Sequence, residues 1–346
     1  MVDRILLFIT AGCLGTLLMK MHLPIPYMLG GMAIAILYKT FAKNNVTKWP
    51  RKFRDMALMV AGYGIGVNFT TDAWNNFLDE LLGISVATAI AIVVSIVIAI
   101  ITAKIAREDL KSCVVGMLPG GITMSLLMAE EDKTVNPNVV VVMQLIRLFG
   151  VIISVPFLTI WLLDAKVINT SLAAVPHEGF HWAVFIPLSI LGRFVAVKLH
   201  LPTPVLLGSI LSTTIFNIFV GNVQPVPGFL MAPAQVSIGL FMGMMLDTKR
   251  IAMTKNILPF AIGGTALLIV ISIGVAYVLA DLYGFSLVTA FLAMAPGGIA
   301  EMALAGLSMG ENVAIILAYQ LVRVVAINMF VPPALAIFFK DKQGIR

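Results

Sequence analysis

The stretch AMAPGGIAEMALAG (residues 293–306) decides how this sequence folds. A proline, two glycines and a carboxylate interrupt a segment that is otherwise apolar. Pro296 lacks a backbone donor and clashes with the preceding turn, and glycine is a weak helix former. Glu301 brings a charge into surroundings where a charge is costly. We therefore expect a broken helix with an acidic side chain close behind the break.

The composition of the whole chain is typical of a membrane protein. Of its 346 residues, 60% are hydrophobic and 12% are charged, whereas soluble domains carry roughly 25% charged residues. Apolar runs such as residues 81–103 exceed the ~20 residues needed to cross a bilayer. The net charge of +6 comes from bases spread among short loops, which does not indicate nucleic-acid binding. The sequence therefore predicts an all-α polytopic membrane protein.

The break occurs twice, because the chain contains an internal duplication. Four blocks recur in the same order at offsets of 176 to 178 residues, which makes chance a poor explanation. Three of the matched pairs are KMHLPIPYMLGGM (from residue 20) with KLHLPTPVLLGSI (from 198), MLPGGITM (117–124) with MAPGGIAE (294–301), and MQLIRLFGVIISVPF (143–157) with YQLVRVVAINMFVPP (319–333). We expect a first membrane repeat in residues 1–165, a linker in 166–179 and a second repeat in 180–346.

Each repeat contains six apolar segments, and the fifth carries the Pro-Gly-Gly break. If that segment dips into the membrane and returns, five segments cross and the repeats are inverted; if it crosses, the repeats are parallel. Lys and Arg residues of loops gather on the cytoplasmic side. With the N-terminus inside, the inverted arrangement places 18 of 20 such residues inside, against 14 for the parallel one. We predict two inverted-topology repeats, each with about five transmembrane helices plus one broken or re-entrant helix, and both termini cytoplasmic.

Broken helices at corresponding positions of inverted repeats are typical of secondary transporters, which bind their substrates there. A helix that restarts after Pro-Gly-Gly presents free N–H groups and the positive end of its dipole, which favour an anion. The alternative is a packing kink, because small residues let helices approach closely. The candidate binding residues at the breaks are Pro119, Gly120, Gly121, Thr123, Pro296, Gly297, Gly298 and Glu301.

Two Gln–Arg pairs complete the candidate site. Arg147 follows Gln144 by three residues and Arg323 follows Gln320 likewise, so each pair shares one helix face. An arginine at the centre of a membrane helix costs roughly 2.5–3.5 kcal/mol and needs partners. Those partners are either Glu301 and backbone carbonyls, in a structural role, or a substrate carboxylate held bidentately.

Other polar motifs are weaker. His22 and His200 head the two HLP motifs, where we expect a turn or cap. HEGFH (residues 177–181) matches the H-E-x-x-H zinc-protease pattern, but a proline precedes it and Gly179 interrupts it, so we expect a solvated loop. We therefore expect no metal, no cofactor and no enzymatic activity.

The paired Pro-Gly-Gly, Gln-Leu-x-Arg and HLPxP blocks resemble the AbrB-duplication family of bacterial integral membrane proteins, over nearly the whole chain. Its members are often labelled transcriptional regulators or ammonia monooxygenases. The resemblance implies a multi-pass protein of the bacterial inner (plasma) membrane and, for some members, an effect on gene expression. The longest polar loop (residues 39–55) is too short for a DNA-reading module. A monooxygenase needs a metal or flavin, and the sequence offers no clustered ligand set besides HEGFH.

We read the sequence as a secondary transporter of a small anionic solute, with its site at the repeat interface and coupling to protons or sodium through Glu301. Its partners would be the solute or ion and the lipid bilayer, without nucleic acid; a homodimer is left open. The alternative is a membrane-embedded ligand sensor that affects gene expression indirectly. A membrane monooxygenase is the third reading.

Overall fold

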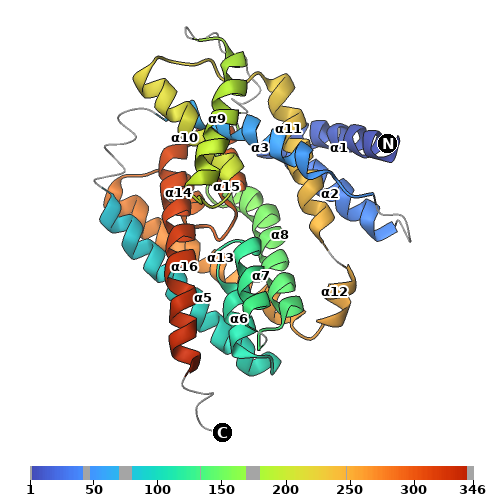
Figure 1. Cartoon of the computed structure of the whole chain (residues 1–346), viewed down its shortest axis with the longest axis vertical. Coiled ribbons are helices and arrows are strands. Elements are labelled where there is room, and N and C mark those ends of the chain that lie inside the picture. Colours follow the sequence, from blue (N-terminus) through green and yellow to red (C-terminus); the bar gives the residue numbers. More distant parts are fainter. Residues whose placement is uncertain are drawn as a thin grey trace. The chain divides into compact units, whose positions relative to one another are not determined.

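The computed structural model describes residues 2–41, 47–69, 80–132, 134–168, 180–246 and 248–340, and these residues are almost all helical (Figure 1). The first half comprises α1 (Val2–Lys20), α2 (Pro26–Phe41), α3 (Arg51–Gly66), α5 (Leu81–Ala106), α6 (Leu110–Met117), α7 (Ile122–Glu131) and α8 (Pro137–Trp161). The second comprises η1 (Trp182–Val184), α9 (Phe185–Lys198), α10 (Pro204–Phe219), α11 (Gly228–Met245), α12 (Thr248–Met253), α13 (Leu258–Tyr283), α14 (Leu287–Met294), α15 (Ile299–Met309) and α16 (Val313–Lys340). The predicted all-α class is confirmed, and in each half the Pro-Gly-Gly segment is split into two short helices.

The two HLP motifs form the same turn. His22 has φ 56° and Ile25 has φ 47°, and their counterparts His200 and Thr203 have φ 53° and 47°. The amide of each histidine donates to a carbonyl three residues earlier, which closes the end of the preceding helix. Both histidines therefore lie in turns, as the sequence predicts.

The HEGFH motif falls mostly outside the described residues, which resume at Phe180. His181 is described, and its Nδ1 accepts a hydrogen bond of 3.2 Å from the amide of Ala183 at the start of η1. Its side chain thus caps a short helix. Within the described part of the chain, no group of three or more His, Cys, Asp or Glu side chains is placed to hold a metal.

The chain forms two compact units, and each takes helices from both halves of the sequence. The first unit comprises Met1–Asp79, Ile153–Leu246 and Ala300–Ile316, and the second comprises Glu80–Ile152, Asp247–Ile299 and Leu317–Arg346. The two compact units therefore do not coincide with the sequence repeats 1–165 and 180–346 expected from the duplication. The division into two repeats stays a prediction about sequence ancestry and topology.

The first unit is built on close backbone contacts between helices. A Cβ at Gly31 of α2 would lie 2.6 Å from the Val236 carbonyl oxygen of α11, and one at Gly239 would lie 2.1 Å from the Met28 carbonyl oxygen. Only glycine permits that approach, because any side chain would collide with backbone. These contacts bring α2 and α11 together, and buried Trp49 adds a hydrogen bond of 2.9 Å from its Nε1 to Ser237.

The second unit has its own hydrophobic core. Buried side chains from five helices meet there, including Ile98 of α5, Met117 of α6, Met143 of α8, Leu268 of α13 and Ile327 of α16. This core encloses the first helix break and fixes α8 and α16, the two helices that carry the Gln–Arg pairs. The helices that carry the Gln–Arg pairs thus contribute to the hydrophobic core of the second unit.

Five described helices are long and apolar enough to cross a membrane: Leu81–Ala106, Pro137–Trp161, Gly228–Met253, Leu258–Tyr283 and Val313–Ala334. Other helices are shorter than the ~20 residues of a full span, with 16 residues in α2 and 14 in α9. The chain is a multi-pass membrane protein. The five crossings expected for each repeat include these shorter helices, and that count stays a prediction.

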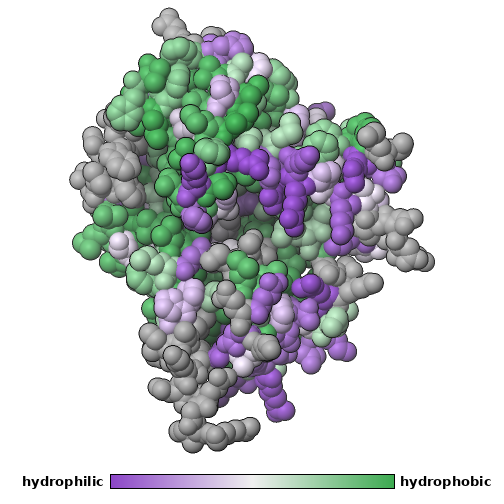
Figure 2. Space-filling model, viewed as in Figure 1, coloured by the Kyte–Doolittle hydropathy of each residue, from purple (hydrophilic) through white to green (hydrophobic). Residues whose placement is uncertain are grey.

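Individual helices expose apolar faces of the kind that contact lipid. On α5 the exposed side chains at Leu82, Val86, Val93, Val97 and Ile101 recur at spacings of four or seven residues along one face. Figure 2 shows hydrophobic side chains gathered over α9 and α10, where exposed residues include Ile190, Leu191, Phe194, Leu211 and Ile215. A helix face made only of large apolar side chains suits a hydrocarbon solvent.

Candidate anion-binding site

The two breaks have the same backbone structure. At the first, the Gly120 amide donates to the Leu118 carbonyl over 2.9 Å, and at the second the Gly297 amide donates to the Ala295 carbonyl over 2.8 Å. Each bond spans two residues and closes a tight turn around the proline, which cannot continue a helix. The carbonyls at the ends of α6 and α14 therefore need partners other than the next helical turn.

The glutamines supply those partners. Gln144 Nε2 lies 3.0 Å from the Val115 carbonyl oxygen and 2.9 Å from that of Leu118. Gln320 Nε2 lies 2.9 Å from the carbonyl oxygen of Leu292 and 3.0 Å from that of Ala295, the corresponding positions of the second repeat. Both glutamines are fully buried. Each one fastens a broken helix end to the long helix that follows it.

Both arginines reach the second break. Arg323 donates from Nη1 to the carbonyl oxygens of Met294 (3.1 Å) and Ala295 (3.0 Å), and from Nη2 to that of Gly297 (3.3 Å). Arg147 of the first repeat donates from Nη1 to the Pro296 carbonyl oxygen over 3.1 Å. The two guanidinium groups thus donate to different carbonyl oxygens of the same turn. Each also donates from Nη2 to the glutamine three residues before it.

The partners of these arginines are polar but uncharged. Arg147 is 5% exposed and Arg323 is 2% exposed, and the Nε of each has no hydrogen-bond acceptor. Within the described part of the second unit, neither guanidinium forms an ion pair with a carboxylate. Carbonyl dipoles satisfy donors without neutralising a charge, so two positive charges meet at the second break. This arrangement favours an anion.

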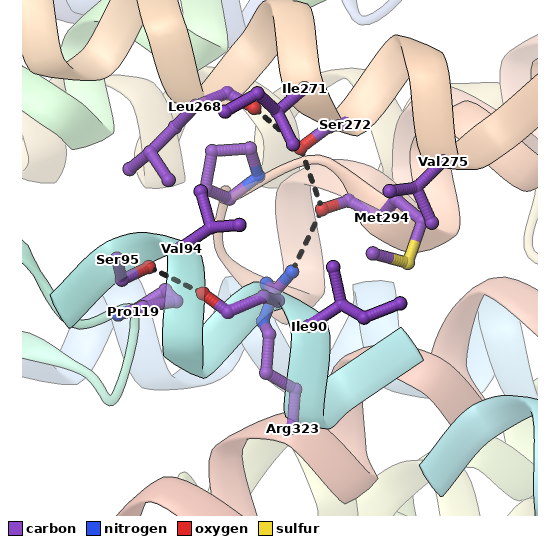
Figure 3. A pocket seen from close by; sticks show the side chains of 12 residues that line it. Ile90, Val94, Ser95, Pro119, Leu268, Ile271, Ser272, Val275, Met294 and Arg323 are labelled. Atoms are coloured by element: carbon purple, nitrogen blue, oxygen red, sulfur yellow. Dashed lines mark hydrogen bonds between the residues drawn. The ribbon is translucent and has the colours of Figure 1, made fainter. Parts of the chain in front are cut away.

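A small pocket opens beside the second break (Figure 3). It lies between α5 and α13, and its cavity volume is about 20 Å³. Arg323, Pro119 and Pro296 line it, together with Ser95 and Ser272. Ser272 Oγ lies 3.3 Å from the Met294 carbonyl oxygen and 2.8 Å from the Leu268 carbonyl oxygen, which is the better acceptor for its single proton. Both prolines of the duplicated motif therefore contribute to one cavity.

The glycines differ in their roles. Gly121 has φ 96°, a conformation that other residues rarely adopt. A Cβ at Gly120 would lie 2.6 Å from Ile327 Cγ2, so Gly120 permits close packing against α16. Gly297 supplies a carbonyl to Arg323, and half-buried Gly298 immediately precedes α15. Gly120 therefore fits the packing alternative, whereas Gly121 and Gly297 shape the break.

Two other predicted residues stand apart. The Thr123 backbone lies in α7, but its side chain is outside the described residues. Glu301 lies in the first turn of α15, is 4% exposed and belongs to the first unit. The structure thus brings Gln144, Arg147, Gln320 and Arg323 together with the second break in one unit, and Glu301 is assigned to the other.

Ser95 and Ser272 were not singled out by sequence reasoning. They are separated by 177 residues, the offset of the duplication, and each stands in a long apolar segment. They could have been found from the sequence as polar residues that recur at the repeat offset within apolar spans.

The fold and the site define a class: a multi-pass helical membrane protein with two broken helices and buried arginines at one break. Residues 27–339 match the family described as "Transition state regulatory protein AbrB", so the chain belongs to the AbrB family. It is 24% identical over 300 residues to "Uncharacterized protein YhjN" of Bacillus subtilis (strain 168), covering 82% of this chain and 78% of that protein. It is 25% identical over 330 residues to "Putative regulator AbrB" of Escherichia coli (strain K12), covering 92% and 91%.

Proposed function

We propose that this protein is a secondary membrane transporter of a small anionic solute. The observation that carries the proposal is the pair of buried guanidinium groups that share the carbonyls of the second break. Intramembrane arginines are rare, and they line substrate pathways or pair with charged or backbone groups. Here backbone carbonyls hold them without cancelling their charge. An anion at this place would supply the missing negative charge.

The broken helices support movement as well as binding. Irregular backbone at membrane depth is tolerated where protein buries it or a cavity meets it, and transporters place such backbone at their binding sites. The hydrogen bonds from Arg323 to neutral carbonyls are weaker than those it would make to an anion. A bound anion can therefore accept hydrogen bonds that Arg323 now donates to the carbonyls of the break. Binding would then release these carbonyls and alter the conformation of the break.

A second candidate function is ligand sensing without transport. The name of the Escherichia coli relative, "Putative regulator AbrB", favours an effect on regulation for that protein. The same arginines would then bind an anion, and the change at the break would be read by a partner. Binding alone does not separate the two functions, whereas movement of the solute across a membrane does.

The test measures uptake of a labelled anion by liposomes that contain purified full-length protein, with chloride, nitrate, phosphate, acetate and succinate tried in turn. Uptake reports movement whether or not a proton or sodium ion moves with the anion. We expect the wild type to take up at least one of these anions. Arg323→Gln should abolish this uptake, because the charge facing the pocket is lost. The matched control is Arg193→Gln, which removes an exposed arginine of α9 in the first unit. Anion binding without uptake of the labelled anion would favour the sensor.

We further propose that Glu301 couples transport to protons or sodium. A carboxyl at membrane depth is costly when charged, so it is suited to exchange a proton or hold a cation. Glu301→Gln keeps the shape and removes that exchange. We expect folded protein that still binds the anion but no longer accumulates it against a gradient. Loss of folded protein, measured by thermal melting in detergent, would instead indicate a purely structural carboxylate.

A further inference from the structure

The walls of the pocket beside the second break are mostly apolar (Figure 3). The side chains facing it from α5 and α13 include Ile90, Val94, Leu268, Ile271 and Val275. Aliphatic walls give nothing to a strongly hydrated ion, and they stabilise a ligand that carries hydrocarbon. The pocket therefore selects for an apolar part in addition to the charge.

The residues that line the pocket carry one positive charge. Arg323 lines it, and Arg147 is not among the lining residues. The described lining offers no second cation to a second carboxylate. Burying an unpaired carboxylate among aliphatic side chains is strongly unfavourable. A monoanion thus matches the site better than a dianion does.

The two hydroxyl groups of the pocket are already engaged. Ser95 donates to the Ala91 carbonyl oxygen over 2.7 Å, and Ser272 donates to that of Leu268 over 2.8 Å. Figure 3 shows Ser95 bonded to its own helix and Ser272 joined by dashed lines both to its own helix and to Met294. A ligand rich in hydroxyl groups would find acceptors here but few free donors. The polar part of a matching ligand is therefore confined to its head.

The volume limits the length of the ligand. A cavity of about 20 Å³ exceeds the ~10–15 Å³ that holds one water, so it admits only a small group. A long hydrocarbon chain would have to force α5 and α13 apart.

We propose that the solute is a short-chain aliphatic monocarboxylate, with its carboxylate on Arg323 and its alkyl group between α5 and α13. This inference rests on the proposed anion transport and names the substrate class for that site. The carboxylate takes donors of Arg323 from the carbonyls of Met294 and Ala295, and the alkyl group contacts Val94 and Leu268. Each buried methylene tightens binding about fourfold until the pocket is full.

The experiment is a calorimetric titration of purified full-length protein with formate, acetate, propionate, butyrate and hexanoate, and with succinate and chloride. We expect affinity to rise from formate to acetate or propionate and to fall from butyrate on, with the best acid at least tenfold tighter than succinate or chloride. Val94→Ala should move the optimum to a longer chain. Val93→Ala, at the adjacent and 58% exposed residue, is the matched control and should leave the profile unchanged.

Val94→Ile is the companion variant if Val94→Ala does not fold, and it should weaken the longest bound acid first. A profile that is the same in wild type and in both folded Val94 variants would overturn the inference. So would an Arg323-dependent preference for succinate or chloride, although Arg323 would then still be an anion-binding residue. If none of these anions nor phosphate or nitrate binds the folded protein, both the inference and the proposed function fall.

Discussion

Gly120 and Gly121 are adjacent, yet different physical demands fix them. Gly121 needs a positive φ, and nothing lies within 4 Å of the place where its Cβ would be. Gly120 has an ordinary φ but faces Ile327 at close range. Gly121 is therefore required by the local backbone conformation, and Gly120 is required by the close packing of Ile327.

That difference predicts a rescue. Gly120→Ala should lower the melting temperature in detergent, because the new methyl group collides with Ile327 Cγ2. Adding Ile327→Ala removes the colliding atom, so the double variant should be more stable than the sum of the two single changes, by roughly 1 kcal/mol or more. Gly121→Ala is the contrast: its cost of about 1–3 kcal/mol comes from φ and should not change with Ile327→Ala. Additive effects in the Gly120 pair would refute close packing there.

Asp132, in the loop after α7, is predicted to make stability depend on acid pH. The Thr134 hydroxyl donates to its carboxylate over 2.6 Å and Lys111 Nζ over 2.9 Å, and together they lower the pKa of Asp132 to about 2. A lowered folded-state pKa means that the stabilisation is complete above about pH 4 and is lost as the pH falls through about 2.

The measurement compares melting temperatures of wild type and Asp132→Asn between pH 2 and pH 6. The wild type should melt higher at pH 5 and above, and the difference should shrink to nothing near pH 2. It will be small, because the side chain is 41% exposed and solvent screens the interaction. A difference that stays constant over the whole range would show that the carboxylate charge contributes nothing.

At the scale of the element, each break is a short turn held by the following long helix. Gln144→Leu should destabilise the protein by about 1–3 kcal/mol, because the carbonyls of Val115 and Leu118 lose a buried donor. Asn138→Leu, at the start of the same helix and away from the break, is the control. Unfolding titrations in detergent would measure both. Equal effects would mean that Gln144 does not hold the break.

Local patterns predicted these elements well. Pro-Gly-Gly predicted the position of both breaks, and the three-residue spacing predicted that each glutamine and arginine share a face; both follow from backbone chemistry near one residue. The contact of Arg147 with Pro296 joins residues 149 positions apart and left no local trace. Sequence reasoning weighed Glu301 with backbone carbonyls, or a solute carboxylate, as the partners of the arginines. Of these, the structure shows the carbonyls of the second break.

For the whole molecule, the duplication predicted the order of helices but not their grouping. Each unit collects corresponding helices of both halves, such as α5 with α13 in the second unit. Helices with similar apolar faces can pair in many ways, and periodicity does not say which pairing is chosen. The pairing depends on how well the helix surfaces fit each other. In the first unit glycines allow close approach, and in the second unit side chains such as Ile98 and Met143 pack together.

The inverted topology is tested by labelling single cysteines from outside the cell, after Cys13 and Cys113 have been changed to serine. The charge distribution predicts Lys166 outside and Lys255 inside. A membrane-impermeant maleimide should therefore label Lys166→Cys in intact cells, and Lys255→Cys only after lysis. The parallel arrangement predicts the reverse, so labelling of Lys255→Cys in intact cells would refute the inversion.

We expect the shared turn at the second break to make transport sensitive to voltage. The guanidinium groups of Arg147 and Arg323 donate to one turn of backbone, and moving one charge through the full field takes about 2.3 kcal/mol per 100 mV. A bound monoanion cancels one of those charges. The empty and loaded forms would therefore feel an interior-negative potential differently, which draws the empty site inward more strongly than the loaded one. Turnover should then depend on the electrical gradient even when the solute itself is balanced across the membrane.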